Sequence, residues 1–498
     1  MSKRVVIIGS GLGGLTCGYI LQRNGYDVTI LEQGVQIGGC LQCFYRRGAK
    51  FETGMHFIGS AEPEQTMGRV MRYFGLDKSV TLSPLDSDGY NVVSLAGSKF
   101  LFPNGREAFI ERFAEYFPHQ KDAIAKYVEI IDGIAESSTL NSLTSANRDI
   151  VVDTEYQTQS INAVMDSIFT DTLLKNALVG DLPLYAAEYG KTPFAQHAYI
   201  MDFYNNSAFR IVGGSDVIAD SLARSIREMG GEILSSKRVT KVCCDDVKAT
   251  GVITADEEFY AADYVISTVH PNRLLEMLDT KLIRPAFRSR ISAIPQTASC
   301  FTLYLKFKEQ AMPYMNSNYY GYAAETPWNC ENYTIEDWPK GFLYMHMCGE
   351  KSPAYARSGV VISYMKMEDV LRWKDGKIGR RGEEYELFKR AYAERLLDEV
   401  EKHHPGLRSS IDCYFTSTPL TYLDYTGTEA GSMYGVAKDV TLGAGGRVPY
   451  RTKVPNLLLA GQNVNSHGIM GVIVGTIMVC SELISAEKLY EQINDLSR

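Results

Sequence analysis

The sequence predicts an α/β fold, and two stretches of the chain carry that prediction. The first, residues 4–32, runs from a short apolar segment through a glycine-rich turn and a helical pattern into a second apolar segment. The second, residues 455–484, has the pattern of a buried strand, a glycine turn and an apolar helix. This alternation is typical of parallel strands joined by helices. Because the two stretches lie at opposite ends of the chain, we expect the domain that they build to be discontinuous.

The N-terminal turn has the spacing Gly9-x-Gly11-x-x-Gly14, directly after the strand and at the start of the helix. The first glycine allows a tight turn, the second lets the backbone approach a pyrophosphate, and the third lets the helix pack closely against the strand. The first turn of the helix offers unpaired N–H groups to phosphates. Glu32, at the end of the second strand, is placed to accept hydrogen bonds from a ribose. The stretch therefore predicts a Rossmann-type dinucleotide site.

A second glycine doublet, Gly38-Gly39, indicates which dinucleotide binds. An NAD domain has no need of this doublet, whereas in FAD enzymes it lets the chain pass close to the ribityl and pyrophosphate groups. The C-terminal helix that begins at Gly468 would direct its positive end toward negative charge on a reduced flavin ring. We therefore expect a Rossmann-type FAD-binding domain with FAD as its cofactor.

Composition indicates which binding partners and which cellular compartment fit this protein. The chain has 498 residues and a net charge of −8, which argues against nucleic acid as a partner. No uninterrupted apolar stretch approaches the roughly 18 residues of a membrane-spanning helix, and no secretory signal precedes the glycine-rich turn. Ten cysteines without a signal indicate a reducing compartment rather than a disulfide framework. We therefore expect a cytoplasmic protein.

The remainder of the chain is expected to form a mixed α+β substrate-binding domain. The middle of the chain has a helix between strand-like runs and then a hairpin pattern, so we expect it to extend the sheet of the FAD-binding domain. The predicted boundaries are residues 1–59, 209–275 and 450–498 for the FAD-binding domain, and residues 60–208 and 276–449 for the substrate-binding domain.

At its glycine motifs and at the Leu-Ala-Gly-Gln-Asn segment, residues 459–463, the chain resembles the FAD-dependent phytoene desaturase and amine oxidase superfamily. Within it, the chain is most similar to the retinol saturases and to proteins related to the carotenoid isomerases and desaturases. Cys40 stands where desaturases and amine oxidases usually carry arginine, so the phosphate or flavin contact of that arginine is not implied for this chain. The segments 51–59 and 197–215 are similar to the corresponding saturase segments.

The resemblance implies a flavin site assembled from all of these segments, with Val239 contacting adenine through its backbone. The implied FAD contacts are Gly9, Gly11, Gly14, Glu32, Gln33, Gly38, Gly39, Met55, Val239, Gly461, Gln462, Gly471 and Val472.

The resemblance also implies an apolar polyene substrate of retinoid or carotenoid type, and saturation of a C=C bond as the expected reaction. Saturation places hydride on one carbon and a proton on the other, so a proton donor is needed near the flavin. His56, His197 and His467 are the candidates, because each lies in or beside a motif expected near the ring and histidine titrates near neutral pH. Each of them also fits a hydrogen-bonded structural histidine.

The sequence also fits other functions. A desaturase or isomerase, an amine or porphyrinogen oxidase, and a non-catalytic flavoprotein all fit the same scaffold. Cys40-x-x-Cys43 fits a redox-active dithiol, whereas a metal site is not expected, because no second C-x-x-C accompanies it. A polyene substrate implies peripheral membrane contact, for which the basic segment 370–381 with Trp373 gives some support.

The electron donor or acceptor is not fixed by the sequence. The chain has one nucleotide fingerprint and no second domain for NADPH. A reductase would therefore receive electrons from NAD(P)H that alternates with the substrate at the single site, or from a partner protein.

Overall fold

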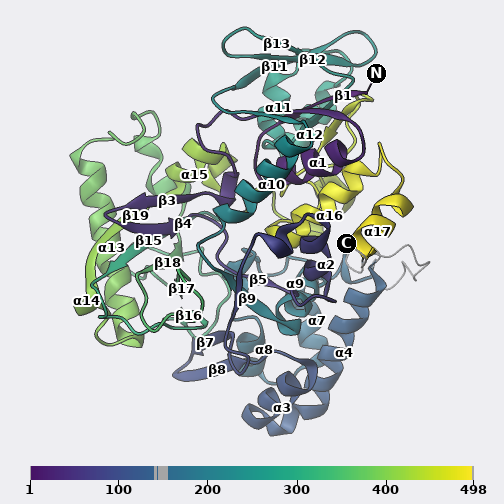
Figure 1. Ribbon diagram of the computed structural model, residues 1–498. Helices are drawn as coiled ribbons and strands as arrows, with labels where there is room; N and C mark the ends of the chain where they lie inside the picture. Colours follow the sequence, from purple (N-terminus) through teal and green to yellow (C-terminus); the bar gives the residue numbers. More distant parts are fainter. Residues whose placement is uncertain (1, 139–142, 144–154, 496–498) are drawn as a thin grey trace.

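Two large sheets organise the chain, one parallel and one mainly antiparallel (Figure 1). The computed structural model describes residues 2–138, 143 and 155–495. The parallel sheet has the strand order β10-β2-β1-β14-β20, and each of its four pairings is parallel. Its strands are β1 (Arg4–Ile8), β2 (Asp27–Leu31), β10 (Glu232–Leu234), β14 (Tyr264–Ser267) and β20 (Leu457–Leu459).

The strands of the parallel sheet come from the N-terminal, middle and C-terminal parts of the chain, so the Rossmann-type domain is discontinuous, as predicted. One face of the sheet is covered by α1 (Leu12–Arg23), which lies against α10 (Asp216–Glu228) and α16 (Gly468–Cys480). Apolar side chains of these helices share one buried cluster with those of β1 and β2. Burial on both faces explains why the strands are continuously apolar.

In the middle of the chain, β10 and β14 extend the parallel sheet as expected, whereas the hairpin between them does not. Instead, β11 (Val239–Cys244), β12 (Ala249–Thr254) and β13 (Phe259–Ala261) form a separate antiparallel sheet, at the top of Figure 1. Val242 and Val252 are buried, whereas their neighbours Lys241 and Ile253 are exposed and half-buried, respectively. A strand with one apolar face suits a sheet that covers the core, not a strand inside a parallel sheet.

The second large sheet has the strand order β19-β15-β18-β17-β16-β7-β8. All of its pairings are antiparallel except that of β16 with β7, which is parallel. Its strands are β7 (Asn91–Leu95), β8 (Ser98–Phe102), β15 (Cys300–Phe307), β16 (Asn318–Tyr322), β17 (Gly341–His346), β18 (Ser358–Tyr364) and β19 (Ile411–Ser417).

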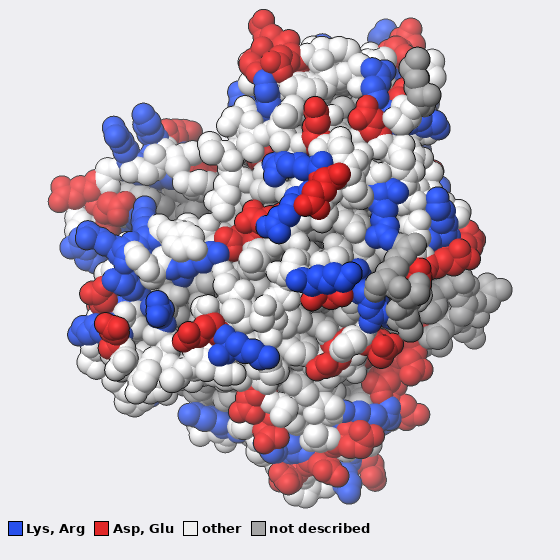
Figure 2. All heavy atoms as spheres, in the orientation of Figure 1, with Lys and Arg blue, Asp and Glu red and all other residues white. Residues whose placement is uncertain are grey.

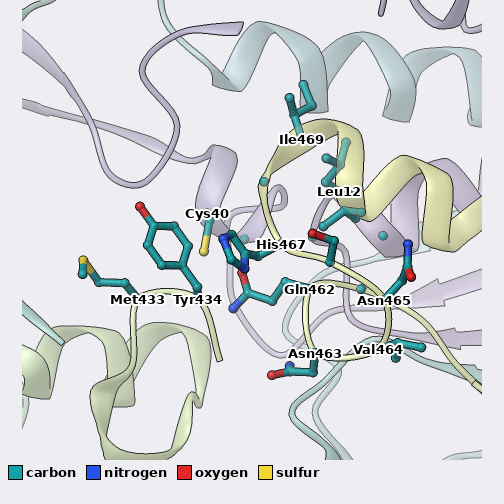
Figure 3. A pocket seen from close by; sticks show the side chains of 18 of the residues that line it. Leu12, Cys40, Met433, Tyr434, Gln462, Asn463, Val464, Asn465, His467 and Ile469 are labelled. Carbon is teal, nitrogen blue, oxygen red and sulfur yellow. The ribbon is translucent and has the colours of Figure 1, made fainter. Parts of the chain in front are cut away.

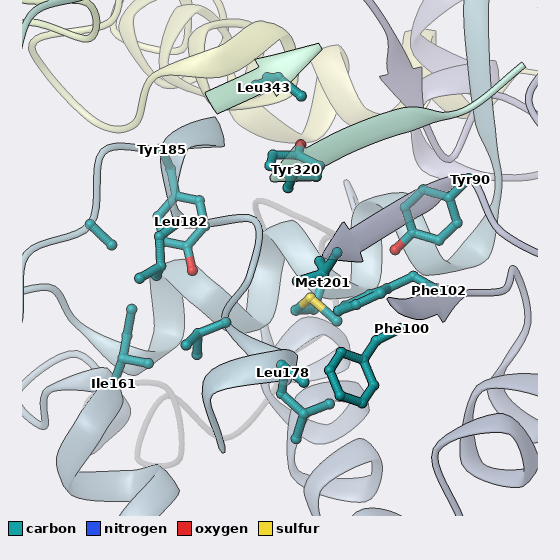
Figure 4. Close-up of a cluster of buried hydrophobic side chains, with 14 of the residues drawn as sticks. Tyr90, Phe100, Phe102, Ile161, Leu178, Leu182, Tyr185, Met201, Tyr320 and Leu343 are labelled. Carbon is teal, nitrogen blue, oxygen red and sulfur yellow. The ribbon is translucent and has the colours of Figure 1, made fainter. Parts of the chain in front are cut away.

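The two faces of this sheet have different neighbours, because side chains alternate along each strand. Phe301 and Leu303 of β15 pack with Leu396 of the long helix α13 (Glu383–His403). Cys300 and Tyr304 of the same strand face a second cluster. That second cluster includes buried side chains of α3 (Arg106–Tyr116), α4 (Lys121–Ser137), α7 (Ile161–Ile168), α8 (Thr172–Leu178) and α9 (Phe194–Asn206), and part of it is seen in Figure 4.

Shorter elements complete the chain and connect the two halves. The strands are β3 (Cys43–Arg46), β4 (Ala49–Glu52), β5 (Ile58–Gly59), β6 (Leu82–Pro84) and β9 (Ala208–Ile211), and the helices are α2 (Thr66–Tyr73), α11 (Pro271–Met277), α12 (Pro285–Ser292), α14 (Leu407–Ser410), α15 (Pro419–Thr426) and α17 (Ala486–Asn494).

Three features concern contact with a membrane: the surface charge, the length and hydrophobicity of the helices, and the burial of Trp373. Basic and acidic side chains are interspersed over the face shown in Figure 2. Within the described part of the chain, no helix is both long and apolar enough to cross a bilayer. Trp373 of the basic segment is 8% exposed and packs against Tyr385 and Phe388. Its indole therefore belongs to the core and is not available as a membrane anchor.

Candidate active site

A cavity of about 900 Å³ is lined by residues of both halves. Ile8, Leu31 and Thr268 line it at the carboxyl ends of β1, β2 and β14, and Leu343 and Ile362 line it from β17 and β18. Ligands of open parallel sheets bind at this edge, and the volume lies at the upper end of the usual range for small-molecule sites. The cavity is therefore the candidate active site.

A glycine cradle forms one wall of the cavity. Gly9 has a φ of +98°, which L side chains rarely adopt. A Cβ on Gly14 would lie 1.9 Å from the carbonyl oxygen of Gly9, and a Cβ on Gly39 would lie 3.0 Å from the Cα of Gly11. Since no side chain fits between these backbones, the cradle exposes bare peptide groups at the N-terminus of α1. This arrangement fits the pyrophosphate of a dinucleotide.

Glu32 lies at the end of β2, next to the cradle, and its carboxylate is fixed by the backbone. Oε2 accepts hydrogen bonds from the backbone N–H (2.9 Å) and the hydroxyl (2.7 Å) of Ser10, and Oε1 accepts one from the N–H of Gly34 (2.7 Å). These contacts fix the side chain at the cavity wall, where Gln33 also lies. Carboxylate oxygens have further lone pairs for ribose hydroxyls.

The N-terminus of α16 meets the N-terminus of α1 beside the cradle. A Cβ on Gly13 would lie 3.0 Å from the Cα of Gly461 and 3.6 Å from Cγ1 of Val472. Two helix N-termini thus approach the same space, which favours negative charge there. Figure 3 shows Leu12, Gln462 and Ile469 around this part of the cavity.

The structure brings together the cofactor residues predicted from the sequence. Gly14 is not among the lining residues, because it lies behind the cradle and packs against Gly9, as the third glycine of the motif should. The others line the cavity: Gly9, Gly11, Glu32, Gln33, Gly38, Gly39, Met55, Val239, Gly461, Gln462, Gly471 and Val472.

His56 is one of the two candidate histidines at the cavity wall. Its Nδ1 lies 3.2 Å from Oε2 of Glu52, and the two side chains are 9% and 5% exposed. A carboxylate at this distance orients the ring and compensates the charge that the ring carries when it holds two protons.

His467 is the second candidate histidine at the cavity wall, and it directly precedes the first turn of α16. Its ring stacks on that of Tyr434, and its Nε2 lies 3.4 Å from Nε2 of Gln196. Its Nδ1 is buried and has no hydrogen-bond partner among the described residues. Burial, with a smaller effect of the Lys438 charge, lowers the pKa of His467 to about 3. The ring is therefore neutral at physiological pH.

His197 lies on α9, outside the cavity wall. Nε2 and Nδ1 are each 2.7 Å from a tyrosine hydroxyl, of Tyr127 and Tyr185 respectively. The residue is fully buried, and burial lowers its pKa to about 3. Both ring nitrogens are used within the core, an arrangement that fits a structural histidine.

The model of the flavin containing amine oxidoreductase family matches residues 12–478. The chain belongs to this family. Membership of this family makes it a flavin oxidoreductase, and the cradle described above fits its cofactor.

Curated relatives match nearly the whole chain. The all-trans-retinol 13,14-reductase of Rattus norvegicus is 26% identical over 533 residues, which cover 99% of this chain and 87% of the relative. Prolycopene isomerase 2 of an Oncidium hybrid cultivar is 22% identical, and the match covers 98% of this chain and 84% of the isomerase.

Solved structures share the α/β fold. An oxidoreductase from Methanosarcina mazei has a TM-score of 0.66 at 16% identity, covering 96% of this chain and 100% of its own. A putrescine oxidase bound to putrescine has a TM-score of 0.62 at 13% identity, covering 97% of this chain and 99% of its own. At these identities the likeness concerns the fold alone.

Two cysteines of this flavin oxidoreductase, Cys40 and Cys43, are free thiols. Burial raises the pKa of Cys40 to about 11, and burial together with Glu52 raises that of Cys43 to about 12. Cys40 lines the cavity, whereas the sulfur of Cys43 lies 3.6 Å from the hydroxyl of Ser215. A redox-active dithiol needs a lowered thiol pKa, so these surroundings disfavour that hypothesis.

Several residues of the cavity wall could not be predicted from the sequence, because they belong to no motif. Tyr434, Gln196 and Lys438 come from loops and a helix of the substrate half. A stretch of apolar side chains lines the same cavity: Leu184, Ile200, Leu343, Met345, Ile362 and Met433.

Proposed function

We propose that this protein is an FAD-dependent oxidoreductase that saturates a C=C bond of an apolar polyene of retinoid or carotenoid type. The observation that carries the proposal is a single cavity that joins the glycine cradle to an apolar wall. Leu343 and Ile362, which are paired across β17 and β18, belong to this wall. The relatives named for retinol reduction and prolycopene isomerisation, and a 4,4'-diapolycopen-4-al dehydrogenase of Metabacillus indicus, support a polyene substrate.

The cradle and its neighbours would hold FAD. The peptide groups of Gly9, Gly11 and Gly39 suit the pyrophosphate, and Glu32 suits the adenosine ribose. The Val239 backbone would contact adenine, and the N-terminal turn of α16 would face the flavin ring. When bound, the flavin supplies hydride to the substrate.

His56 is the proposed proton donor. It lines the cavity and is backed by the Glu52 carboxylate, so the pair holds a proton beside the substrate and tolerates its transfer. His467 is neutral, and we assign it a hydrogen-bonding role at the cavity wall. His197 is assigned to the core of the substrate half, where it positions α9 and takes no part in the reaction.

Electrons and substrate would reach the flavin through the same cavity. NAD(P)H is the proposed external donor; because the sequence has one nucleotide fingerprint, it would alternate with the substrate at this site. A partner protein is the alternative. We further propose peripheral membrane contact at the cavity rim. There, Tyr425 is 65% exposed and lines the cavity, and Leu442 is 41% exposed beside Gly443 of the lining.

An anaerobic experiment tests the reaction. The FAD-loaded enzyme is reduced with dithionite, mixed with all-trans-retinol or a carotenoid in detergent, and followed by flavin absorbance with mass analysis of the product. We expect flavin reoxidation together with a gain of two hydrogens in the polyene. A flavin that stays reduced beside an unchanged polyene would reject the proposal. Reoxidation by air with peroxide release would favour an amine-type oxidase, and a change of double-bond geometry without mass gain would favour an isomerase.

Separate experiments address the donor and the membrane. Anaerobic bleaching of the flavin by NADPH or NADH would support a nicotinamide donor, and its absence would favour a partner protein. Sedimentation with phosphatidylcholine vesicles should carry the enzyme down, and Tyr425→Ser with Leu442→Ser should abolish this. Vesicle binding that the double variant leaves unchanged would place the contact elsewhere.

A further inference from the structure

Lys438 lies on the wall of the cavity, in the loop before η8 (Val440–Gly446). The backbone on both sides of it is held in place. The N–H of Val436 donates to Oδ1 of Asn463 (3.0 Å), that of Ala437 to the carbonyl of Pro295 (2.8 Å), and that of Val440 to the carbonyl of Lys191 (2.8 Å). The lysine is therefore attached to a fixed part of the wall.

The ammonium of Lys438 has no anionic partner within the described part of the chain. Neither a hydrogen bond nor an ion pair joins it to a described residue, and the charged group that acts on it is Arg447. The neighbouring carboxylate of Asp439 instead accepts hydrogen bonds from the N–H (2.8 Å) and the hydroxyl (2.6 Å) of Thr441. Burial and the Arg447 charge lower the pKa of Lys438 to about 8. A charge held in this way lacks compensation from the protein.

His467 adds a second polar group to the same part of the wall. Both side chains line the same cavity, and the Lys438 charge contributes to the lowered pKa of His467. If the amide N–H of Gln196 donates to Nε2 of His467, across the 3.4 Å that separates them, the neutral ring carries its hydrogen on Nδ1. That Nδ1 is buried without a partner among the described residues. An ammonium and an imidazole N–H are a donor pair suited to a carboxylate.

We propose that Lys438 and His467 bind a carboxylate at one end of the substrate, so that the natural substrate is a polyene acid. This inference rests on the proposed function, to which it adds the polar end group. An alcohol or a hydrocarbon would leave the ammonium charge uncompensated, whereas a carboxylate neutralises it. The phosphates of FAD have their own cradle at Gly9 and Gly39, whereas the loop of Lys438 is bonded to Pro295 and Lys191 of the substrate half as well as to Asn463. The rest of the substrate would lie along the apolar wall.

Ligand binding tests the inference independently of turnover. The dissociation constants of all-trans-retinoic acid and all-trans-retinol are measured on the FAD-loaded enzyme at pH 7 by quenching of protein fluorescence. We expect the acid to bind at least about 10-fold more tightly than the alcohol, as charge-assisted hydrogen bonds imply. Lys438→Met should remove this preference and leave alcohol binding within about 2-fold, whereas Lys438→Arg should keep it. Lys453→Met, which changes an exposed lysine outside the cavity, is the matched control.

The pH gives a second readout. Affinity for the acid should fall as the pH rises above about 8, where free Lys438 loses its proton, and the fall should be absent in Lys438→Arg. The other titratable or charged side chains at this site are His467, which is already neutral over this range, and Arg447 and Asp439.

Three results would overturn the inference. Equal affinity of the wild type for acid and alcohol is the first, and a preference that survives Lys438→Met is the second. The third is loss of bound FAD in Lys438→Met, which would assign the lysine to the cofactor phosphates. If the acid preference and its dependence on Lys438 are found but no polyene is saturated, the carboxylate site stands and the proposed reaction fails.

Discussion

The imidazole of His467 stacks on the phenol ring of Tyr434, with ring centroids 4.5 Å apart and planes inclined by 27°. His467 belongs to the N-terminus of the cofactor helix α16, and the hydroxyl of Tyr434 donates to the carbonyl of Pro183 in the substrate half (3.2 Å). The stacked pair therefore connects the predicted flavin side of the cavity to its substrate side (Figure 3).

Gly14→Ala should abolish FAD binding. The new Cβ would lie 1.9 Å from the carbonyl oxygen of Gly9, so α1 must move away from the cradle that receives the pyrophosphate. The ratio of flavin to protein absorbance in the purified variant should fall below about a tenth of that of the wild type, a loss of at least about 1.4 kcal/mol in binding. Gly133→Ala in α4, where a Cβ meets nothing within 4 Å, should keep full flavin content. Normal flavin content in Gly14→Ala would show that the cofactor binds elsewhere.

His56→Asn should slow saturation by about 100-fold or more, the usual effect of losing a positioned proton donor. The measurement is single-turnover reoxidation of the dithionite-reduced enzyme by the polyene. Glu52→Gln should slow it less, because the ring stays in place without its charged partner. Flavin content and the rate of dithionite reduction should not change in either variant. An unaltered rate in His56→Asn would remove His56 from the mechanism.

His197→Phe should lower stability without affecting the chemistry. It leaves the buried hydroxyls of Tyr127 and Tyr185 without their partner, at a cost of about 1–3 kcal/mol for each unsatisfied group. Thermal unfolding should therefore show a midpoint several degrees lower, while single-turnover rates of the folded enzyme stay within about 2-fold. His119→Phe, at a histidine whose side chain is 62% exposed, should leave the midpoint nearly unchanged. A slow but stable His197→Phe variant would return this residue to the catalytic candidates.

Cys40→Ser and Cys43→Ser should each retain turnover within about 3-fold. With thiol pKa values raised to about 11 and 12, fewer than about one in a thousand of either group is a thiolate at pH 8. Electron transfer through a dithiol would stop in both variants, so the same single-turnover assay distinguishes the two hypotheses.

The sequence by itself determined the cofactor half of this protein. The spacing Gly9-x-Gly11-x-x-Gly14, the doublet Gly38-Gly39 and the acid at Glu32 act through neighbouring backbone geometry, which is local and can be recognised without coordinates. Val239 was assigned only through the resemblance to a family, which transfers long-range geometry already solved elsewhere.

The tertiary structure decided what the rest of the chain contributes. The three histidines looked equivalent in sequence, yet two line the cavity and His197 is enclosed by two tyrosines, because burial depends on packing between helices distant in the chain. The hairpin after β10 left the parallel sheet, since its pattern gives only one apolar face. Lys438 became noticeable only when folding placed it on the wall of the same cavity as His467, without an ion pair to a described residue, because charge compensation depends on neighbours in space and not in sequence.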